Sequence, residues 1–135
     1  MDRFTISACH SLKLIPLDIV ARYVRLSSRV SMLLLGEAID AVAVPGTIKI
    51  STSNDKGKIK KKITFERSDV SESVADMMER YKVTRLVATY VDESGRRRVC
   101  GSPDWPLSLD YAIEGGVFTV TIQGEDTMPD GFLMD

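Results

Sequence analysis

The chain has 135 residues, a mass of 15.0 kDa and a formal net charge of −1. This length suits one domain with a real hydrophobic core and is too short for two ordinary domains. Apolar residues make up 44% and charged residues 27%, which is average for a soluble globular protein. The near-zero net charge excludes a global attraction to nucleic acid or membranes, so a partner must be identified from local features.

Targeting and redox signals are sparse. Polar residues are spread through the first sixteen positions, which contain no apolar run of signal-peptide length. No segment reaches the roughly 18 apolar residues that a membrane span needs, so we expect a cytoplasmic protein. Cys9 and Cys100 show no CxxC spacing and no histidine cluster, which argues against a metal site. A disulfide between them stays open, but we expect both to be reduced, small core residues.

The first third of the chain contains one clear pattern and one ambiguous region. Apolar and polar residues alternate from Phe4 to Leu14, which predicts a long strand, or two strands broken by a bulge, ended by Pro16. Residues 17–44 fit either a helix or strands. The run 30–35 is short and apolar enough for a buried strand, but periodicity alone leaves an amphipathic helix open.

Residues 47–66 predict a lysine-rich hairpin that turns at residues 54–57. We expect Ser53 to lie opposite Lys58 and Ile50 opposite Lys61. The base of this hairpin would then be buried, and its tip would stand in solvent.

One α-helix is predicted from Asp69 to Lys82. Asp69 followed by Glu72 resembles a capping box, and apolar residues recur at helical spacing from Val70 to Tyr81. Acidic residues lie near its start and basic residues near its end, which matches the helix dipole.

Two more hairpins are predicted between residues 84 and 124. In the second, the Gly115-Gly116 turn opposes Ile113 with Phe118, and continuing this register opposes Tyr111 with Val120 and Leu109 with Ile122. We therefore expect Tyr111, Ile113, Phe118, Val120 and Ile122 to be mostly buried. In the first, a turn at residues 92–95 opposes Val91 with Arg96, Tyr90 with Arg97 and Ala88 with Val99.

These elements predict an α+β fold that is mostly antiparallel β. We expect a sandwich or partly closed barrel of hairpins with one flanking helix at about residues 69–82. Residues 1–124 would form a single β-rich domain, and residues 125–135, which contain Pro129 and Gly131, would form an extended C-terminal tail.

No catalytic constellation is evident, so we do not expect an enzyme, a cofactor or a small-molecule substrate. The sole histidine, His10, lies on the apolar face of the first predicted strand without a second titratable partner, which favours a core position over a general base. No phosphate-binding glycine loop, HExxH motif or EF-hand spacing is present.

Basic residues gather in two places and are candidate interaction residues. Strand alternation puts Lys58, Lys60 and Lys62 on one face within the lysine-rich stretch 56–62, and Arg96 and Arg98 open a later strand. Such cations suit a nucleic-acid-binding module, but lysines on an exposed hairpin also prevent edge-to-edge aggregation. We expect Lys58, Lys60, Arg96 and Arg98 to be mostly exposed.

Three apolar residues are further candidates. Trp105, between Pro103 and Pro106, suits either an anchor for a partner protein or a cover over the open end of the core. Phe132 and Leu133 lie in the acidic tail. That tail could contact the basic hairpin of the next subunit in a ring, although an ordinary frayed terminus is equally compatible with the sequence.

A family resemblance rests on three segments: residues 85–97 (RLVATYVDESGRR), residues 100–107 (CGSPDWPL) and residues 119–124 (TVTIQG). Their order resembles the small structural proteins of phage and prophage tail or neck modules of Bacteroidetes, mainly over residues 47–124. The resemblance implies a virion assembly protein, present in the bacterial host or in the virion, whose partners are its own copies or other virion proteins.

Overall fold

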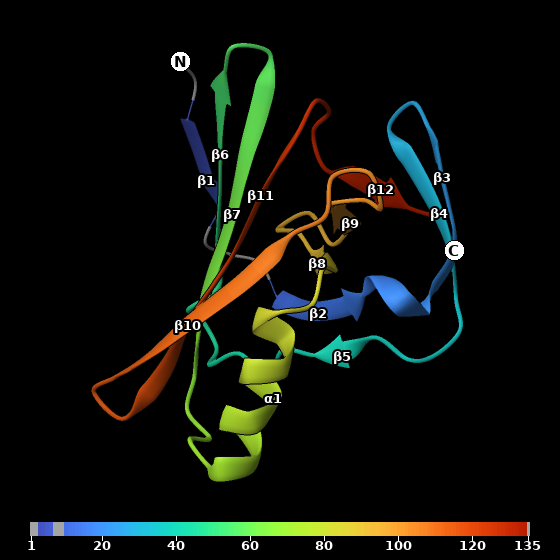
Figure 1. The fold of residues 1–135 in the computed structure, drawn as a ribbon. Helices are drawn as coiled ribbons and strands as arrows, with labels where there is room; N and C mark the ends of the chain where they lie inside the picture. The colour runs from blue at the N-terminus through green and yellow to red at the C-terminus, as the bar shows by residue number, and fades with distance from the viewer. Residues whose placement is uncertain (1–2, 7–9, 135) are drawn as a thin grey trace.

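The computed structural model describes residues 3–6 and 10–134, and within them the chain forms two β-sheets, one α-helix and one short 3-10 helix (Figure 1). The α-helix, α1, spans Glu72–Lys82, and the 3-10 helix, η1, spans Leu17–Ile19. The strands are β1 (Arg3–Ile6), β2 (His10–Pro16), β3 (Val20–Leu26), β4 (Arg29–Leu34), β5 (Ile39–Asp40), β6 (Lys49–Asp55), β7 (Lys58–Arg67), β8 (Leu86–Val91), β9 (Arg97–Cys100), β10 (Ser108–Glu114), β11 (Val117–Asp126) and β12 (Gly131–Leu133).

The strands form a five-stranded sheet A and a seven-stranded sheet B. Sheet A has the order β1-β6-β7-β11-β10, and sheet B has the order β3-β4-β12-β9-β8-β2-β5. All neighbours are antiparallel except β12 and β4, which are parallel. The predicted fold class is therefore confirmed: an α+β protein of mostly antiparallel strands with one flanking helix.

The main core lies between the two sheets and α1. Phe65, Phe118 and Ile122 contribute from sheet A, Leu86 from sheet B and Met78 from the helix, and each is at most 1% exposed. Burial of such side chains stabilises the fold by about 1.5 to 3 kcal/mol each. The sandwich is thus held by apolar side chains from every layer.

A second core lies on the other face of sheet B. Ile15, Val87 and Val99 pack there against Val30 of β4, with Leu133 of β12 at the edge of the cluster. Sheet B therefore has a packed cluster on each face. The interior strand β8 is consequently buried on both faces, which explains why it is an apolar run and does not alternate.

The β10–β11 hairpin has the predicted register throughout. Ile113 pairs with Phe118, Tyr111 with Val120, and Leu109 with Ile122. Phe118, Val120 and Ile122 are buried as expected. Tyr111 is only half-buried, and the expectation for Ile113 is wrong: it is 54% exposed, because the end of this hairpin extends beyond the rest of the fold (Figure 1).

The β8–β9 hairpin is shifted by one residue from the prediction. Val91 pairs with Arg97 and Tyr90 with Arg98, because the loop has one residue more than expected. Asp92 holds this loop: its Oδ1 accepts hydrogen bonds from the backbone N–H groups of Ser94 and Arg96, and its own N–H donates to the Arg96 carbonyl. The shift moves Arg98, instead of Arg97, opposite Tyr90.

The β6–β7 hairpin is shifted by two residues. Asp55 pairs with Lys58, since Lys56 and Gly57 form a two-residue turn with φ angles of 52° and 82°, as type I′ requires. A shift of two keeps each side chain on its predicted face. Ile50 consequently faces Ile63 and not Lys61.

Residues 17–44 adopt the strand alternative. After η1, β3 and β4 form a hairpin, and the apolar run 30–35 coincides with β4 almost completely. The helix α1 starts later than predicted, because Ser71 and not Asp69 is its N-cap, accepting a hydrogen bond from the Val74 N–H. Asp69 instead pairs with Arg67 at 2.6 Å.

The predicted extended tail is wrong. Glu125 and Asp126 are the last residues of β11, and β12 inserts between β9 and β4 in sheet B. Without β12, the facing edges of β9 and β4 would lack a hydrogen-bonding partner at this position. The end of the chain is therefore a structural part of sheet B.

Candidate functional site

The predicted lysine row is present on the outer face of sheet A. Lys58, Lys60 and Lys62 are all exposed, as expected from the alternation. Lys60 and Lys62 line a groove of about 480 Å³ whose other walls are Ser51, Thr52, Ser53, Lys61, Ser108, Gln123, Gly124 and Glu125. The groove thus combines cations with hydroxyl and amide groups.

Acidic neighbours reduce the positive charge of this groove. Lys58 Nζ lies 3.9 Å from Glu125 Oε2, and Lys60 Nζ lies 3.6 Å from Asp55 Oδ2. Lys62 has no ion-pair partner among the residues that the structure describes. Exposed pairs of this kind contribute little to stability.

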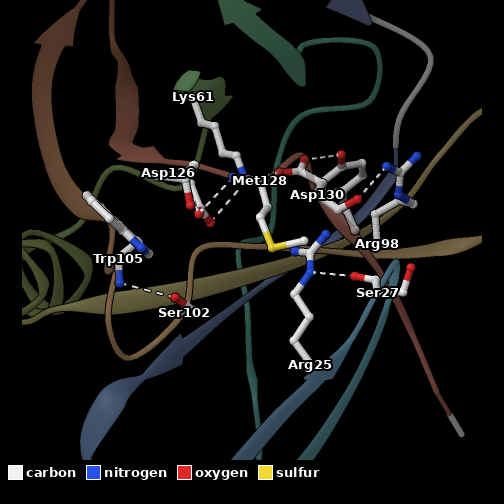
Figure 2. A network of polar contacts seen from close by, with 11 residues as sticks. Arg25, Ser27, Lys61, Arg98, Ser102, Trp105, Asp126, Met128 and Asp130 are labelled. Atoms are coloured by element: carbon white, nitrogen blue, oxygen red, sulfur yellow. Dashed lines mark hydrogen bonds and ion pairs between the residues drawn. The ribbon is translucent and has the colours of Figure 1, made fainter. Parts of the chain in front are cut away.

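The sequence reasoning missed a buried ionic cluster between the two sheets (Figure 2). Lys61 of β7 is 2% exposed, and its Nζ lies 2.9 Å from Asp130 Oδ1 and 3.4 Å from Asp126 Oδ2. Asp126 Oδ1 in turn accepts hydrogen bonds from the backbone N–H groups of Thr127 and Met128. One feature of the sequence could have indicated this cluster: Lys61 lies between Ile59 and Ile63 on the inward face of the strand.

The cluster extends into sheet B through Asp130. The Tyr90 hydroxyl donates to Asp130 Oδ2 over 2.5 Å, and Arg98 Nη2 donates to the Asp130 carbonyl over 2.7 Å. Arg98 also lies 3.5 Å from Asp92. Three acidic and two basic side chains therefore compensate one another where β11 leaves sheet A and β12 enters sheet B.

Burial and charge shift several pKa values in this cluster. Burial lowers the pKa of Lys61, but the charges of Asp130 and Asp126 outweigh it and hold that pKa above its usual value. Burial, with the Asp130 charge, raises the pKa of Tyr90 and of Cys100. Lys61 is therefore an ammonium ion, and Tyr90 and Cys100 are neutral at pH 7, which suits a structural ion pair and not a nucleophile.

Three other candidate residues meet around one aromatic ring. The guanidinium groups of Arg98 and Arg96 lie 4.2 and 5.5 Å from the centroid of the Phe132 ring. Arg98 is thereby half-buried, so its predicted exposure is wrong, whereas Arg96 is exposed as expected. Leu133 packs into the second core. Phe132 and Leu133 thus pack within the chain, and each stays partly exposed.

The acidic residues of the predicted tail contact the basic hairpin of the same chain. Lys58 and Lys61 of the basic hairpin contact Glu125, Asp126 and Asp130 of their own chain. These two lysines therefore have acidic partners within one protomer, and the contact between neighbouring subunits stays a prediction.

The remaining candidates stay apart from these clusters. Trp105 is half-buried in a turn where its backbone N–H donates to the Ser102 hydroxyl, so its side chain is neither a fully exposed anchor nor a fully buried cover of the core. His10 is exposed, so the expected core position is wrong. Cys100 is buried and free, as expected, whereas Cys9 lies outside the described residues. Residues 3–6 and 10–134 contain no group of three metal-ligating side chains and no helix long and apolar enough to span a membrane.

An exposed apolar face was not anticipated. Val24 and Leu26 of β3, with Leu33 of β4 and Leu35 just after it, are exposed by 40%, 67%, 59% and 74%. On the inner face of the same hairpin, Val30, Met32 and Leu34 pack into the second core. We call the outer face of residues 20–35 the β3–β4 face.

No protein-family model, characterised protein or solved structure matches this chain.

Proposed function

We propose that this chain is a non-enzymatic assembly protein that associates with a second copy of itself through the β3–β4 face. The observation that carries the proposal is the exposure of Val24, Leu26, Leu33 and Leu35 on one side of a two-stranded ribbon. Contiguous apolar surface of this kind on a soluble protein usually marks an interaction site. Two arginines, Arg22 and Arg29, lie within the same face.

The position of β3 supports a strand as the occupant. β3, a strand of seven residues, is an outer strand of sheet B, and its outer edge has no strand partner among the described residues. The other outer strands are better protected or shorter: α1 contacts β10 through Glu79 and Tyr111, whereas β5 has two residues and β1 has four. β3 contains no proline or lysine, the residues that commonly block edge pairing.

A second copy fits this edge by symmetry. If two β3 strands pair antiparallel around Val24, Arg22 of each lies opposite Leu26 of the other. Such a two-fold contact brings aliphatic side chains together and keeps the Arg22 charges apart. Two-fold interfaces between identical chains are the commonest type of assembly, and they need only one self-complementary surface.

The proposal includes a role in a virion. The short motif in residues 85–107 supports a tail or neck component, as described above. Negative-stain microscopy of concentrated protein tests this part separately. A discrete dimer that forms no ring or tube would keep the assembly role and contradict the virion role.

Light scattering coupled to size-exclusion chromatography, over a range of protein concentrations, tests the association itself. The Leu26→Lys and Leu33→Lys variants should shift the chain to monomer, since each places a charge in the apolar contact. Val83→Lys is the matched control, because Val83 is also exposed but follows α1, away from the β3–β4 face. A wild-type chain that stays monomeric at every concentration would overturn the proposal.

The lysine groove supports a second candidate function, the binding of a polyanion such as nucleic acid. The favouring observation is that Lys62 lacks an acidic partner among the described residues and lies in a groove lined by hydroxyl groups. Titration with single- and double-stranded oligonucleotides at two salt concentrations tests it. Binding should weaken with added salt and with Lys62→Gln, and an absence of binding at low salt removes this candidate.

A further inference from the structure

We propose that a pocket beside Phe132 binds a phosphate group. The pocket has a volume of about 630 Å³ and lies at the joint of three elements of sheet B: the β3–β4 turn, the β8–β9 turn and β12. Its lining residues are Ser28, Arg29, Gly95, Arg96, Arg97, Phe132 and Leu133. The lining includes three arginines and no acidic residue.

The sheet register brings the arginines to this place. Phe132 of β12 pairs with Arg29 of β4 on one side and with Arg98 of β9 on the other. Paired residues on neighbouring strands point to the same face, so an arginine flanks the ring on each side. Arg96 reaches the ring from the loop before β9. Residues from distant parts of the sequence thus form one cationic site.

Two of these arginines are free to receive a ligand. The side chains of Arg29 and Arg96 are exposed, and in the part of the chain that the structure describes their guanidinium groups have no ion-pair or hydrogen-bond partner; that of Arg96 lies over the Phe132 ring. A guanidinium offers parallel N–H donors that match two oxygens of one phosphate. Two such groups beside one pocket can therefore bind a phosphate from two directions.

Arg98 and Phe132 hold the site in shape without binding the ligand. Arg98 donates to the carbonyl oxygens of Asp130 and Gly131, which fixes the backbone on both sides of the entry into β12. Its guanidinium stacks on the Phe132 ring at 4.2 Å. Because cations already occupy this ring, it is not available to stack on a nucleobase, and the site recognises charge instead of a base.

Isothermal titration with inorganic pyrophosphate at low salt tests the proposal. Pyrophosphate should bind, and Arg29→Gln and Arg96→Gln should each weaken binding by roughly tenfold, since each removes a charge-assisted contact. Arg80→Gln is the control: it removes the same charge from the exposed face of α1 and should leave the affinity unchanged. Thermal melting checks that each variant is folded, and two independent variants guard against one local disturbance.

The outcomes separate a specific site from general attraction. No pyrophosphate binding, or equal weakening by all three substitutions, would overturn the proposal. A short single-stranded oligonucleotide, titrated in parallel, identifies the source of the phosphate. If it binds more tightly than pyrophosphate and with the same dependence on Arg29 and Arg96, the phosphate belongs to a nucleic-acid backbone; if it binds no better, the phosphate belongs to a small ligand. Arg29 also lies within the β3–β4 face but Arg96 does not, so the effect of Arg96→Gln tests the pocket separately from the assembly proposal.

Discussion

Lys61 Nζ lies 2.9 Å from Asp130 Oδ1, and this ion pair joins the middle of sheet A to the segment that enters sheet B (Figure 2). Both side chains are almost completely buried. An isolated charge in such a place would be very unfavourable, so each partner is tolerated only because the other is present. The pair therefore fixes how the last strand docks.

Replacing Lys61 with Met should destabilise the fold by about 3 to 5 kcal/mol, because Asp126 and Asp130 would remain buried without a cation. Lys62→Met is the matched control: Lys62 is the next residue on the same strand but is exposed, and its replacement should change the free energy of unfolding by less than about 0.5 kcal/mol. Urea denaturation followed by circular dichroism measures both. Equal changes in the free energy of unfolding for the two substitutions would show that the buried cluster does not stabilise the fold.

Stability should fall in alkali. The pKa of Lys61 is raised in the folded state, so the stabilisation it gives is complete below its usual pKa of 10.5 and is lost as the pH rises through the folded pKa. The pKa of Tyr90 is also raised, so above its usual pKa of 10.0 the unfolded chain releases a proton that the folded chain keeps. Both effects lower the free energy of unfolding as the pH rises.

Melting temperatures measured from about pH 8 to about pH 12 test this expectation. Tyr90→Phe should lower the melting temperature at pH 8, since Asp130 loses a hydrogen bond, but should make the alkaline fall shallower. An identical pH dependence in the variant and in the wild-type chain would contradict the role given to Tyr90.

The two partners Ile113 and Phe118 should differ strongly when truncated, although they face each other in one hairpin. Phe118 is completely buried, and Phe118→Ala should cost about 3 to 5 kcal/mol. Ile113 is 54% exposed, and Ile113→Ala should cost less than about 1 kcal/mol. Chemical denaturation measures both losses of unfolding free energy. Similar losses for Phe118→Ala and Ile113→Ala would indicate that the hairpin is uniformly buried.

Adding one methyl group at Gly131 should disturb the insertion of β12. A Cβ there would lie 2.5 Å from Val30 Cγ2, which is closer than atoms can approach without movement. We expect Gly131→Ala to destabilise the chain by about 1 to 3 kcal/mol. At Gly36 the nearest atom to such a Cβ is 3.8 Å away, so Gly36→Ala serves as the control. A neutral effect at Gly131 would indicate that β12 docks loosely.

Local signals in the sequence were enough for the elements whose register depends on neighbouring residues. The Gly115-Gly116 turn and the alternation around it determined the β10–β11 pairing completely, because a one-residue slip would have turned Phe118, Val120 and Ile122 to water. Alternation in the lysine-rich hairpin likewise placed Lys58, Lys60 and Lys62 on the outer face. The predicted register of that hairpin was wrong by two residues, which does not change the face of a side chain.

The tertiary structure decided the features that depend on residues far apart in the chain. Lys61 is buried because the later residues Asp126 and Asp130 neutralise it, and Arg98 stacks on Phe132 because β12 inserts beside β9. No local period encodes such contacts. The β8–β9 register likewise depended on the side chain of Asp92, whose hydrogen bonds lengthen the loop by one residue. Sequence alone therefore determined which side chains of each hairpin share a face. Packing between distant segments determined which charged side chains come together.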